Sequence, residues 1–461
     1  MKNLQAPILQ GLLSIQKQDK YRFHMPGHKG KFLELYKPLI DNLLALDFTE
    51  INGTDDLYNS NDILKNGLDL LTKERKSKKS FYLTNGTTVG ILASIIALTE
   101  KNDYILISKD CHKSVYNAIE LNSLNPIILE NKVENSGLVY PIEENTLLEK
   151  LKKYPETKMV VISRPNYYGL CSNIENLATY CKDNKIYLLI DEAHGSHFSY
   201  HENLPTSSME LGAHISVNSF HKTLPALTQC SVLNLNYNLT DYEIMKILNM
   251  VEKLQTSSPS YLLMSSIDLA RAYMEENGHD KLKTLEKNIN EFYKSIKNLN
   301  WIKQPKYPSL YTKDFTRILL ETTIPAVNVQ KYLEKNNIYI EMIGEKLLVL
   351  ITSIVDSKSD FEYLSNILNK YSPKENLVIQ SPVNSDSSKS FSDGEIVDLN
   401  KSLGKTLKEN IIIYPPGSVY LKAGEKITQE NIDYINKLLQ SGIKVYTDFN
   451  KDINFLYVSL D

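Results

Sequence analysis

Short apolar runs alternate with helix-like stretches from about residue 80 onward, and this alternation constrains the fold of the 461-residue chain more than any other feature. The apolar runs are Phe81–Thr84, Tyr104–Ile107, Pro126–Leu129, Met159–Ser163, Ile186–Asp191 and Ile215–Asn218, and the helical patterns between them are Val89–Leu98, Ser114–Leu121 and Ile174–Lys182. Strands that are apolar along their whole length and separated by helices are typical of a parallel sheet covered on both faces. The sequence therefore predicts an α/β fold with a mostly parallel sheet.

Further units follow this first one. Residues 240–300 read as successive helices, including Asp268–Glu275 and Lys281–Leu299, and a second α+β pattern follows. That pattern consists of predicted strands at Thr316–Leu320 and Leu347–Thr352 and a helix at Val327–Lys335. The stretch 380–393 is rich in Ser, Asp and Pro, as linkers are. We expect an N-terminal segment with an active-site loop over 1–60, a large domain over 61–300, a small α+β domain over 301–375, a linker over 376–393 and a C-terminal α+β unit over 394–461.

Composition excludes several classes of protein. The 52 Lys and Arg residues nearly balance the 55 Asp and Glu residues, so the formal charge of −3 offers no footprint for nucleic acid or anionic lipid. The four cysteines form no CxxC pair and no metal-ligand spacing, and they are too few for a disulfide scaffold. No run reaches about 18 apolar residues. We expect a cytoplasmic protein with no nucleic-acid partner, no membrane partner and no metal.

A lysine and an acid stand at the ends of two predicted strands. Lys222, in the segment Ser219–Thr223 (SFHKT), lies beside hydroxyls and a histidine, a setting that suits an amine forming a Schiff base. Asp191 ends the most apolar run and is followed by Glu192-Ala193-His194. The carboxyl end of a parallel strand borders the crevice where α/β sheets bind ligands. A carboxylate there can keep a pyridinium nitrogen protonated, and the small Ala193 leaves room for a flat ring.

The letters D-E-A-H also occur in helicase-type ATPases, which offers a competing interpretation. An ATPase needs a phosphate loop of the form GxxxxGK[ST]. The sequence has one Gly-Lys-Thr, at Gly404–Thr406, and Leu399 stands where the first glycine of that loop is required. We therefore reject the ATPase interpretation.

Two further segments follow predicted strands. Asn85–Gly90 (NGTTVG) opens a helical pattern, and its backbone N–H groups with the hydroxyls of Thr87 and Thr88 form either an anion site or a simple helix cap. His112 opens the next helix, where an imidazole can stack on a planar cofactor or lie on the surface. The segment Asn85–Gly90, His112, Asp191 and Lys222 are thus four candidate elements, and each of them follows a predicted strand.

These segments together resemble the ornithine/lysine/arginine decarboxylases, which are pyridoxal 5'-phosphate (PLP) enzymes of fold type I. The resemblance includes RFHMPGHKG, DFTEINGTDDL, DEAHGSHF, KTLPALTQCSV, QTSSPSY and YPPG, and it runs from about residue 20 to 430. It implies the aspartate aminotransferase-like fold for the large domain. About twenty residues precede the first motif, so the resemblance is to the short form without an N-terminal wing domain.

The resemblance also implies roles for individual residues. Lys222 would carry PLP, Asp191 would pair with the pyridine nitrogen, His112 would stack on the ring, Ala193 would pack beneath it and His194 would lie near the phenolic oxygen. Gly86, Thr87, Thr88, Ser219 and His221 would surround the phosphate, and Thr256 would reach it from a neighbouring subunit, which implies a homodimer. Glu409, five residues before Tyr414, stands where the family places an acid, and we expect it with the turn 414–417 at the substrate entrance. The chain departs from the family pattern at Lys408, Ser418-Val419 and Ala423.

The reaction implied is decarboxylation of a basic amino acid, namely arginine, lysine or ornithine, to the corresponding amine and CO₂. Two alternatives remain open from the residues alone. One is another fold type I reaction, such as aldol cleavage or transamination, and the other is a PLP-binding protein with little turnover. An aminotransferase would need an arginine in its small domain to clamp a carboxylate, and Arg317 is the only arginine after residue 271.

Overall fold

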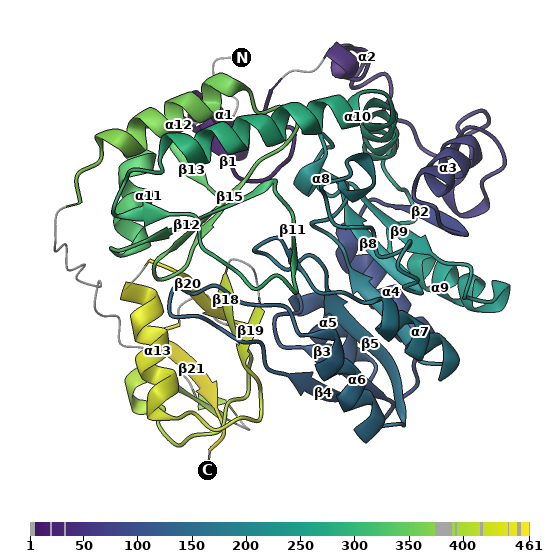
Figure 1. Ribbon diagram of the computed structural model, residues 1–461. Coiled ribbons are helices and arrows are strands. Elements are labelled where there is room, and N and C mark those ends of the chain that lie inside the picture. The colour runs from purple at the N-terminus through teal and green to yellow at the C-terminus, as the bar shows by residue number, and fades with distance from the viewer. Residues whose placement is uncertain are drawn as a thin grey trace.

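The computed structural model describes residues 5–18, 21–31, 34–373, 390–391, 394–414, 418–440, 442–449 and 453–460. Its largest sheet has seven strands in the order β2-β9-β8-β7-β5-β3-β4 (Figure 1). Their bounds are β2 (Lys79–Leu83), β3 (Tyr104–Ser108), β4 (Asn125–Leu129), β5 (Thr157–Ser163), β7 (Tyr187–Asp191), β8 (Ile215–Ser219) and β9 (Ser231–Leu235). Only β9 runs against the others, pairing antiparallel with both β8 and β2. The predicted mostly parallel sheet is confirmed, and β9 is the strand that the sequence analysis missed.

The central strands are apolar throughout because both faces of the sheet are covered. Along β3, Ile105 and Ile107 belong to one apolar core and Leu106 to the other. The covering helices are α4 (Gly86–Leu98), α5 (Lys113–Leu121), α6 (Glu144–Lys153), α7 (Glu175–Asp183) and α9 (Asp241–Leu254). Helix α4 lies close on the sheet at Gly90, where a Cβ atom would come within 2.9 Å of Val217 Cγ1. This close packing fixes the start of α4 relative to the strand ends.

One helix, α10 (Tyr261–Ser295), spans 35 residues where the sequence analysis predicted separate helices at Asp268–Glu275 and Lys281–Leu299. The predicted break is wrong because Gly278 lies inside the helix. A Cβ atom there would lie 3.3 Å from Tyr200 Cβ, so this glycine permits close packing and does not end the helix. In Figure 1, α10 runs from the large sheet to the small α+β unit, where Phe292 contacts Phe361.

The small unit is a four-stranded antiparallel sheet in the order β10-β12-β15-β14. It comprises β10 (Ile302–Lys303), β12 (Arg317–Thr322), β14 (Met342–Ile343), β15 (Leu347–Ile351), α11 (Ala326–Lys335) and α12 (Lys358–Lys370). Near the N-terminus, β1 (Tyr21–Phe23) pairs in parallel with β13 (Ile338–Ile340). The loop after β1 then reaches the large unit, where Gly27 N donates to His221 O at 2.7 Å. The N-terminal segment therefore connects the small unit to the loop that carries Lys222.

The C-terminal unit has its own apolar core, which includes Leu407, Ile411, Ile435 and Leu456. Its elements are β16 (Ser390–Phe391), β17 (Gly394–Asp398), β18 (Ile411–Tyr414), β19 (Ser418–Leu421), α13 (Gln429–Gln440), β20 (Lys444–Thr447) and β21 (Phe455–Val458). It lies below the small unit and beside β3 and α5 in Figure 1. Most of the predicted linker lies outside the described residues, and so do residues 415–417 of the predicted entrance turn.

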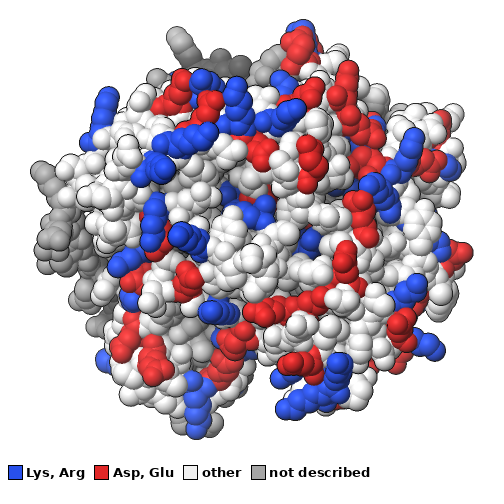
Figure 2. Space-filling model, viewed as in Figure 1, with Lys and Arg blue, Asp and Glu red and all other residues white. Residues whose placement is uncertain are grey.

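Charges of both signs are mixed on the surface. Figure 2 shows Lys and Arg interspersed with Asp and Glu over this face, in line with the near balance of charges in the sequence. Among the described residues, every helix is too short or too polar to cross a bilayer.

Candidate active site

A cavity of about 420 Å³ opens where several parallel strands of the large sheet end. Its wall includes Asp110, His112, Asp191, His194 and Lys222, together with residues from the small and C-terminal units such as Met342 and Tyr434. The structure therefore brings four residues singled out in the sequence, His112, Asp191, His194 and Lys222, to one place. Strand order explains this, because the carboxyl ends of neighbouring parallel strands meet at one edge of the sheet.

Lys222 lies in the single turn α8 (Phe220–Thr223), directly after β8. Its Nζ atom is 3.0 Å from His194 Nε2. Burial lowers the pKa of Lys222 from its usual value, while the charge of Asp191 acts in the opposite direction. A lowered pKa raises the fraction of neutral amine, which is the form that attacks a carbonyl.

His194 is held on three sides and is only 6% exposed. Lys222 Nζ contacts its Nε2 atom, and Arg317 Nη2 lies 2.6 Å from its Nδ1 atom. The ring of Tyr167 meets the imidazole edge-on, with 4.7 Å between the ring centroids. Burial lowers the pKa of His194 well below its usual value, and the charges of Lys222 and Arg317 lower it further. The imidazole is therefore neutral at physiological pH.

Asp191 and His112 line the cavity from neighbouring parts of the sheet edge. Asp191 Oδ1 accepts a hydrogen bond from Ala193 N at 3.1 Å, which orients the carboxylate at the end of β7. His112 caps α5, where its Nδ1 accepts from Ser114 N at 3.2 Å. Burial lowers the pKa of His112 to about 4, against the charge of Asp191, so this ring is also neutral.

The start of α4 has the features of an anion-binding site. Gly86 adopts a φ of +75° and opens the helix, and the Asn85 side chain caps none of the first N–H groups. Thr87 Oγ1 lies 3.3 Å from Ser219 Oγ, which ends β8, and Thr88 is exposed beside it. Free N–H groups at a helix start with two hydroxyls suit a phosphate.

These features match the groups of PLP one by one. The helix start with Thr87 and Ser219 suits its phosphate, Asp191 its ring nitrogen and Lys222 its aldehyde. His221 Nδ1 donates to Cys230 O at 3.0 Å, which holds this ring beside Lys222. The donors and acceptors present therefore fit the cofactor.

Thr256 and Glu409 lie elsewhere. Thr256 is exposed, and its backbone N lies 3.5 Å from Asn85 Oδ1 of the same chain. Glu409 is 1% exposed inside the C-terminal unit, where its carboxylate accepts from Tyr457 N at 2.7 Å and Phe449 N at 3.3 Å. It does not belong to the described wall of the cavity. The expectation that Glu409 lies at the substrate entrance does not match this position, because its own unit encloses the carboxylate.

Sequence reasoning missed other residues at the site. Tyr167 follows β5, so the strand-end rule that found Asp191 could also have found it. Arg317 was considered as a clamp for a carboxylate, whereas the structure places it against His194. Glu341, which accepts from the Tyr167 hydroxyl and from Met25 N, lies between two short strands and carried no signal.

The model of the Orn/Lys/Arg decarboxylase major domain matches residues 6–317 of this chain. YaaO of Bacillus subtilis, described as uncharacterised, is 32% identical over 95% of each chain. The arginine decarboxylase of Halalkalibacterium halodurans is 27% identical, covering 96% of this chain and 95% of its own. The chain belongs to the Orn/Lys/Arg decarboxylase family.

The fold agrees with this assignment. The solved lysine decarboxylase LdcF of Francisella novicida superposes with a TM-score of 0.75 over 99% of this chain and 78% of its own, at 18% identity. The chain is thus a fold type I enzyme with PLP as cofactor, and its reaction class is decarboxylation of a basic amino acid. The sequence prediction of family, fold, cofactor and reaction class is confirmed.

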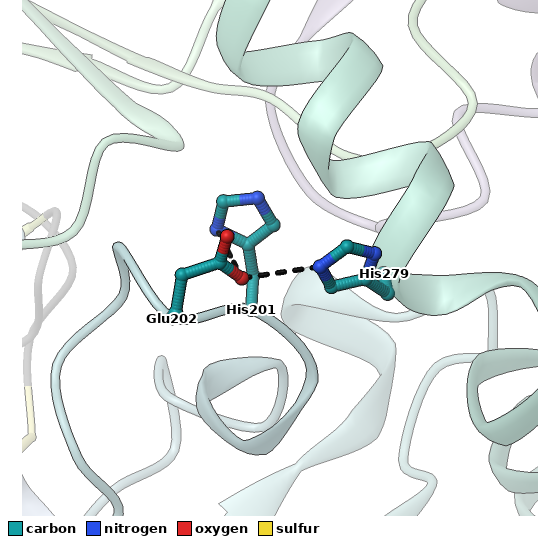
Figure 3. A group of neighbouring side chains, drawn as sticks. All are labelled: His201, Glu202 and His279. Carbon is teal, nitrogen blue, oxygen red and sulfur yellow. Dashed lines mark hydrogen bonds and ion pairs between the residues drawn. The ribbon is translucent and has the colours of Figure 1, made fainter.

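A second group of titratable side chains lies away from the cavity, at His201, Glu202 and His279 (Figure 3). His279 Nε2 is 3.1 Å from Glu202 Oε2, and its Nδ1 is 3.3 Å from Asp280 Oδ1. His201 Nδ1 accepts from Asn203 N at 3.2 Å. Because three of the four ring nitrogens face partners within the chain, we interpret the group as a polar contact that ties α10 to the loop after the single turn Phe198–Tyr200.

Proposed function

We propose that this chain decarboxylates arginine to its amine and CO₂, using Lys222 as the residue that carries PLP. The observation that carries the assignment of roles is the meeting of Lys222, Asp191, His112 and His194 on the wall of one cavity. Arginine is favoured among the basic amino acids because the similarity to an arginine decarboxylase extends over nearly the full length of both chains.

The roles of the residues follow from their positions. When bound, PLP supplies a ring that accepts the electron pair left by the departing carboxylate. The Asp191 carboxylate would keep the proton on the ring nitrogen, so that the ring could accept those electrons. His112 would cover the ring, and the start of α4 with Thr87, Thr88 and Ser219 would hold the phosphate. Ala193 would leave space beneath the ring, and Lys222 Nζ would be the site of attachment.

A guanidinium substrate needs an anionic partner at the far end of the cavity. Besides Asp191, the acids on the cavity wall are Asp110, Glu134 and Glu345. Burial raises the pKa of Asp110, and Glu345 is paired with Lys437 at 2.8 Å. Glu134, which accepts from the Tyr140 hydroxyl, lies on an exposed part of the wall and keeps one carboxylate oxygen for a cation. We propose that the Glu134 carboxylate binds the guanidinium of the substrate.

We also propose a homodimer with shared active sites. The family pattern places Thr256 beside the partner's phosphate, and Thr256 is exposed at the surface of this chain. Mixing Lys222→Ala chains with Thr256→Ala chains should restore part of the activity, because one site of the hybrid then has both residues intact. An active protein that sediments as a monomer would contradict the shared site.

The reaction itself is tested with purified protein incubated with PLP and with arginine, lysine or ornithine in turn. Product masses identify the amine formed, and kcat/KM ranks the three substrates. We expect arginine to rank first. A higher kcat/KM for lysine or ornithine would overturn the choice of substrate, and a keto acid product would overturn the assignment of decarboxylation.

A further inference from the structure

We propose that Arg317 is a positioning residue that fixes the tautomer of His194 and thereby keeps Lys222 ready to receive the cofactor. The inference rests on the proposed role of Lys222. The observation behind it is an uninterrupted chain of contacts, from Arg317 Nη2 to His194 Nδ1 at 2.6 Å and from His194 Nε2 to Lys222 Nζ at 3.0 Å.

The direction of each hydrogen bond follows from the chemistry of the guanidinium. Arginine carries five N–H donors and no acceptor, and it stays protonated in proteins. His194 Nδ1 must therefore accept, and a neutral imidazole that accepts at Nδ1 carries its proton on Nε2. The alternative tautomer would place an N–H of His194 directly against an N–H of Arg317 at 2.6 Å, which is repulsive.

The consequence reaches Lys222 through the second contact. With a proton on Nε2, His194 donates toward Lys222 Nζ, and only a neutral amine has the lone pair to accept it. An ammonium group there would again place two donors face to face. Arg317 thus selects the neutral form of Lys222 from a distance. Burial and the charge of Arg317 lower the pKa of Lys222 in the same direction, while the charges of Asp191 and Glu341 act against them.

The guanidinium of Arg317 is buried and has few hydrogen-bond partners. Arg317 is 1% exposed, and its Nε and Nη1 atoms have no hydrogen-bond partner among the described residues. The bond to His194 is therefore the one hydrogen bond that the guanidinium makes among the described residues, and the charges of Asp314 and Glu341 act on it as well. Arg317 begins β12 of the small unit, so the setting of the histidine depends on how that unit docks on the large sheet.

The tautomer can be read directly in the cofactor-free protein, which separates this test from the choice of substrate. In protein labelled with ¹⁵N-histidine, long-range ¹H–¹⁵N correlation distinguishes protonated from bare ring nitrogens, and the signal that disappears in His194→Gln identifies this residue. We expect a proton on Nε2 in the wild-type protein. A proton on Nδ1, or on both nitrogens, near pH 7.5 overturns the proposal without any variant of Arg317.

A second readout is the rate at which PLP attaches to Lys222, followed by absorbance from pH 6 to 10. Arg317→Met should mix the two tautomers and move the midpoint of this rate profile upward by about one pH unit, which slows attachment at pH 7 about tenfold. Arg317→Lys retains a charged donor and should restore much of the wild-type profile. Unchanged tautomer and unchanged profile in Arg317→Met would refute the positioning role.

A neighbouring lysine provides a control for the loss of a buried basic side chain. Lys313 donates to the backbone oxygens of Tyr168, Asp314 and Arg317 and does not contact the imidazole of His194 among the described residues. Burial lowers the pKa of Lys313 to about 7, so Lys313→Met removes a side chain that is largely neutral near pH 7.5 and leaves the Arg317 guanidinium in place. It should leave the tautomer of His194 unchanged. A change in tautomer as large as that of Arg317→Met would assign the effect to disturbed packing around Arg317 instead of the hydrogen bond.

Discussion

Two buried carboxylates, Asp191 in the large unit and Glu409 in the C-terminal unit, show how differently two acids of similar burial can be used. Asp191 ends a parallel strand, and its carboxylate reaches the cavity while Ala193 N orients one oxygen. Glu409 precedes a strand of a small antiparallel sheet, and backbone N–H groups of its own unit occupy both of its oxygens. A polar side chain is available for chemistry where the backbone around it leaves part of it unpaired.

The largest effect expected from this comparison is at Asp191. Asp191→Asn removes the charge that keeps the ring nitrogen protonated, so kcat should fall by about 10²–10³-fold. The absorbance of the bound cofactor should persist, because the phosphate site at the start of α4 is untouched. Steady-state kinetics with a parallel spectrum checks both, and a variant with near wild-type kcat would remove Asp191 from the reaction.

Glu409 should affect stability and leave catalysis alone. Glu409→Gln replaces one acceptor oxygen by an amide group that cannot accept from Tyr457 N or Phe449 N in the same way. The free energy of unfolding should fall by about 1–3 kcal/mol, the usual cost of leaving a buried hydrogen-bonding group without its partner. Urea unfolding measures this, and a KM for arginine raised tenfold in this variant would return Glu409 to the substrate site.

Glu134→Gln is the counterpart that should affect substrate binding. Loss of one charge-assisted contact, at an exposed part of the cavity wall, should raise KM for arginine about tenfold with kcat nearly unchanged. Glu345→Gln is the matched control on the same wall, since Lys437 already neutralises that acid. Equal effects of the two substitutions would show that the wall contributes only a general negative field.

The smallest expected effect is a pH dependence of stability at Glu409. Burial raises the pKa of Glu409 above its ordinary value of 4.5. Between pH 4.5 and this higher pKa the folded protein holds more protons than the unfolded chain, so the contribution of Glu409 to stability falls as pH rises through this interval. The difference in unfolding free energy between wild type and Glu409→Gln should therefore shrink from pH 4.5 upward. A difference that grows with pH would mean that the native carboxylate is stabilised in its charged form.

The same contrast explains how much the sequence could predict. The positions of Lys222 and Asp191 follow from topology alone, because unbroken apolar runs imply a parallel sheet and strand ends imply its active edge. No comparable rule applies to Glu409, whose environment is set by contacts of Phe449 and Tyr457 from distant parts of the C-terminal unit. Arg317 and Glu341 reach the site only through docking of the small unit, which a local pattern does not encode.

The uninterrupted helix α10 has a mechanical consequence. At about 1.5 Å per residue, its 35 residues make a rod about 52 Å long with one end in each of two units. A tilt of only about 5° at the large unit would displace the far end by about 4.5 Å, since a rigid rod converts rotation into translation. Such a displacement would move the small unit, which carries Arg317, relative to the imidazole. The geometry of the contact between Arg317 and His194 therefore depends on how both ends of α10 pack.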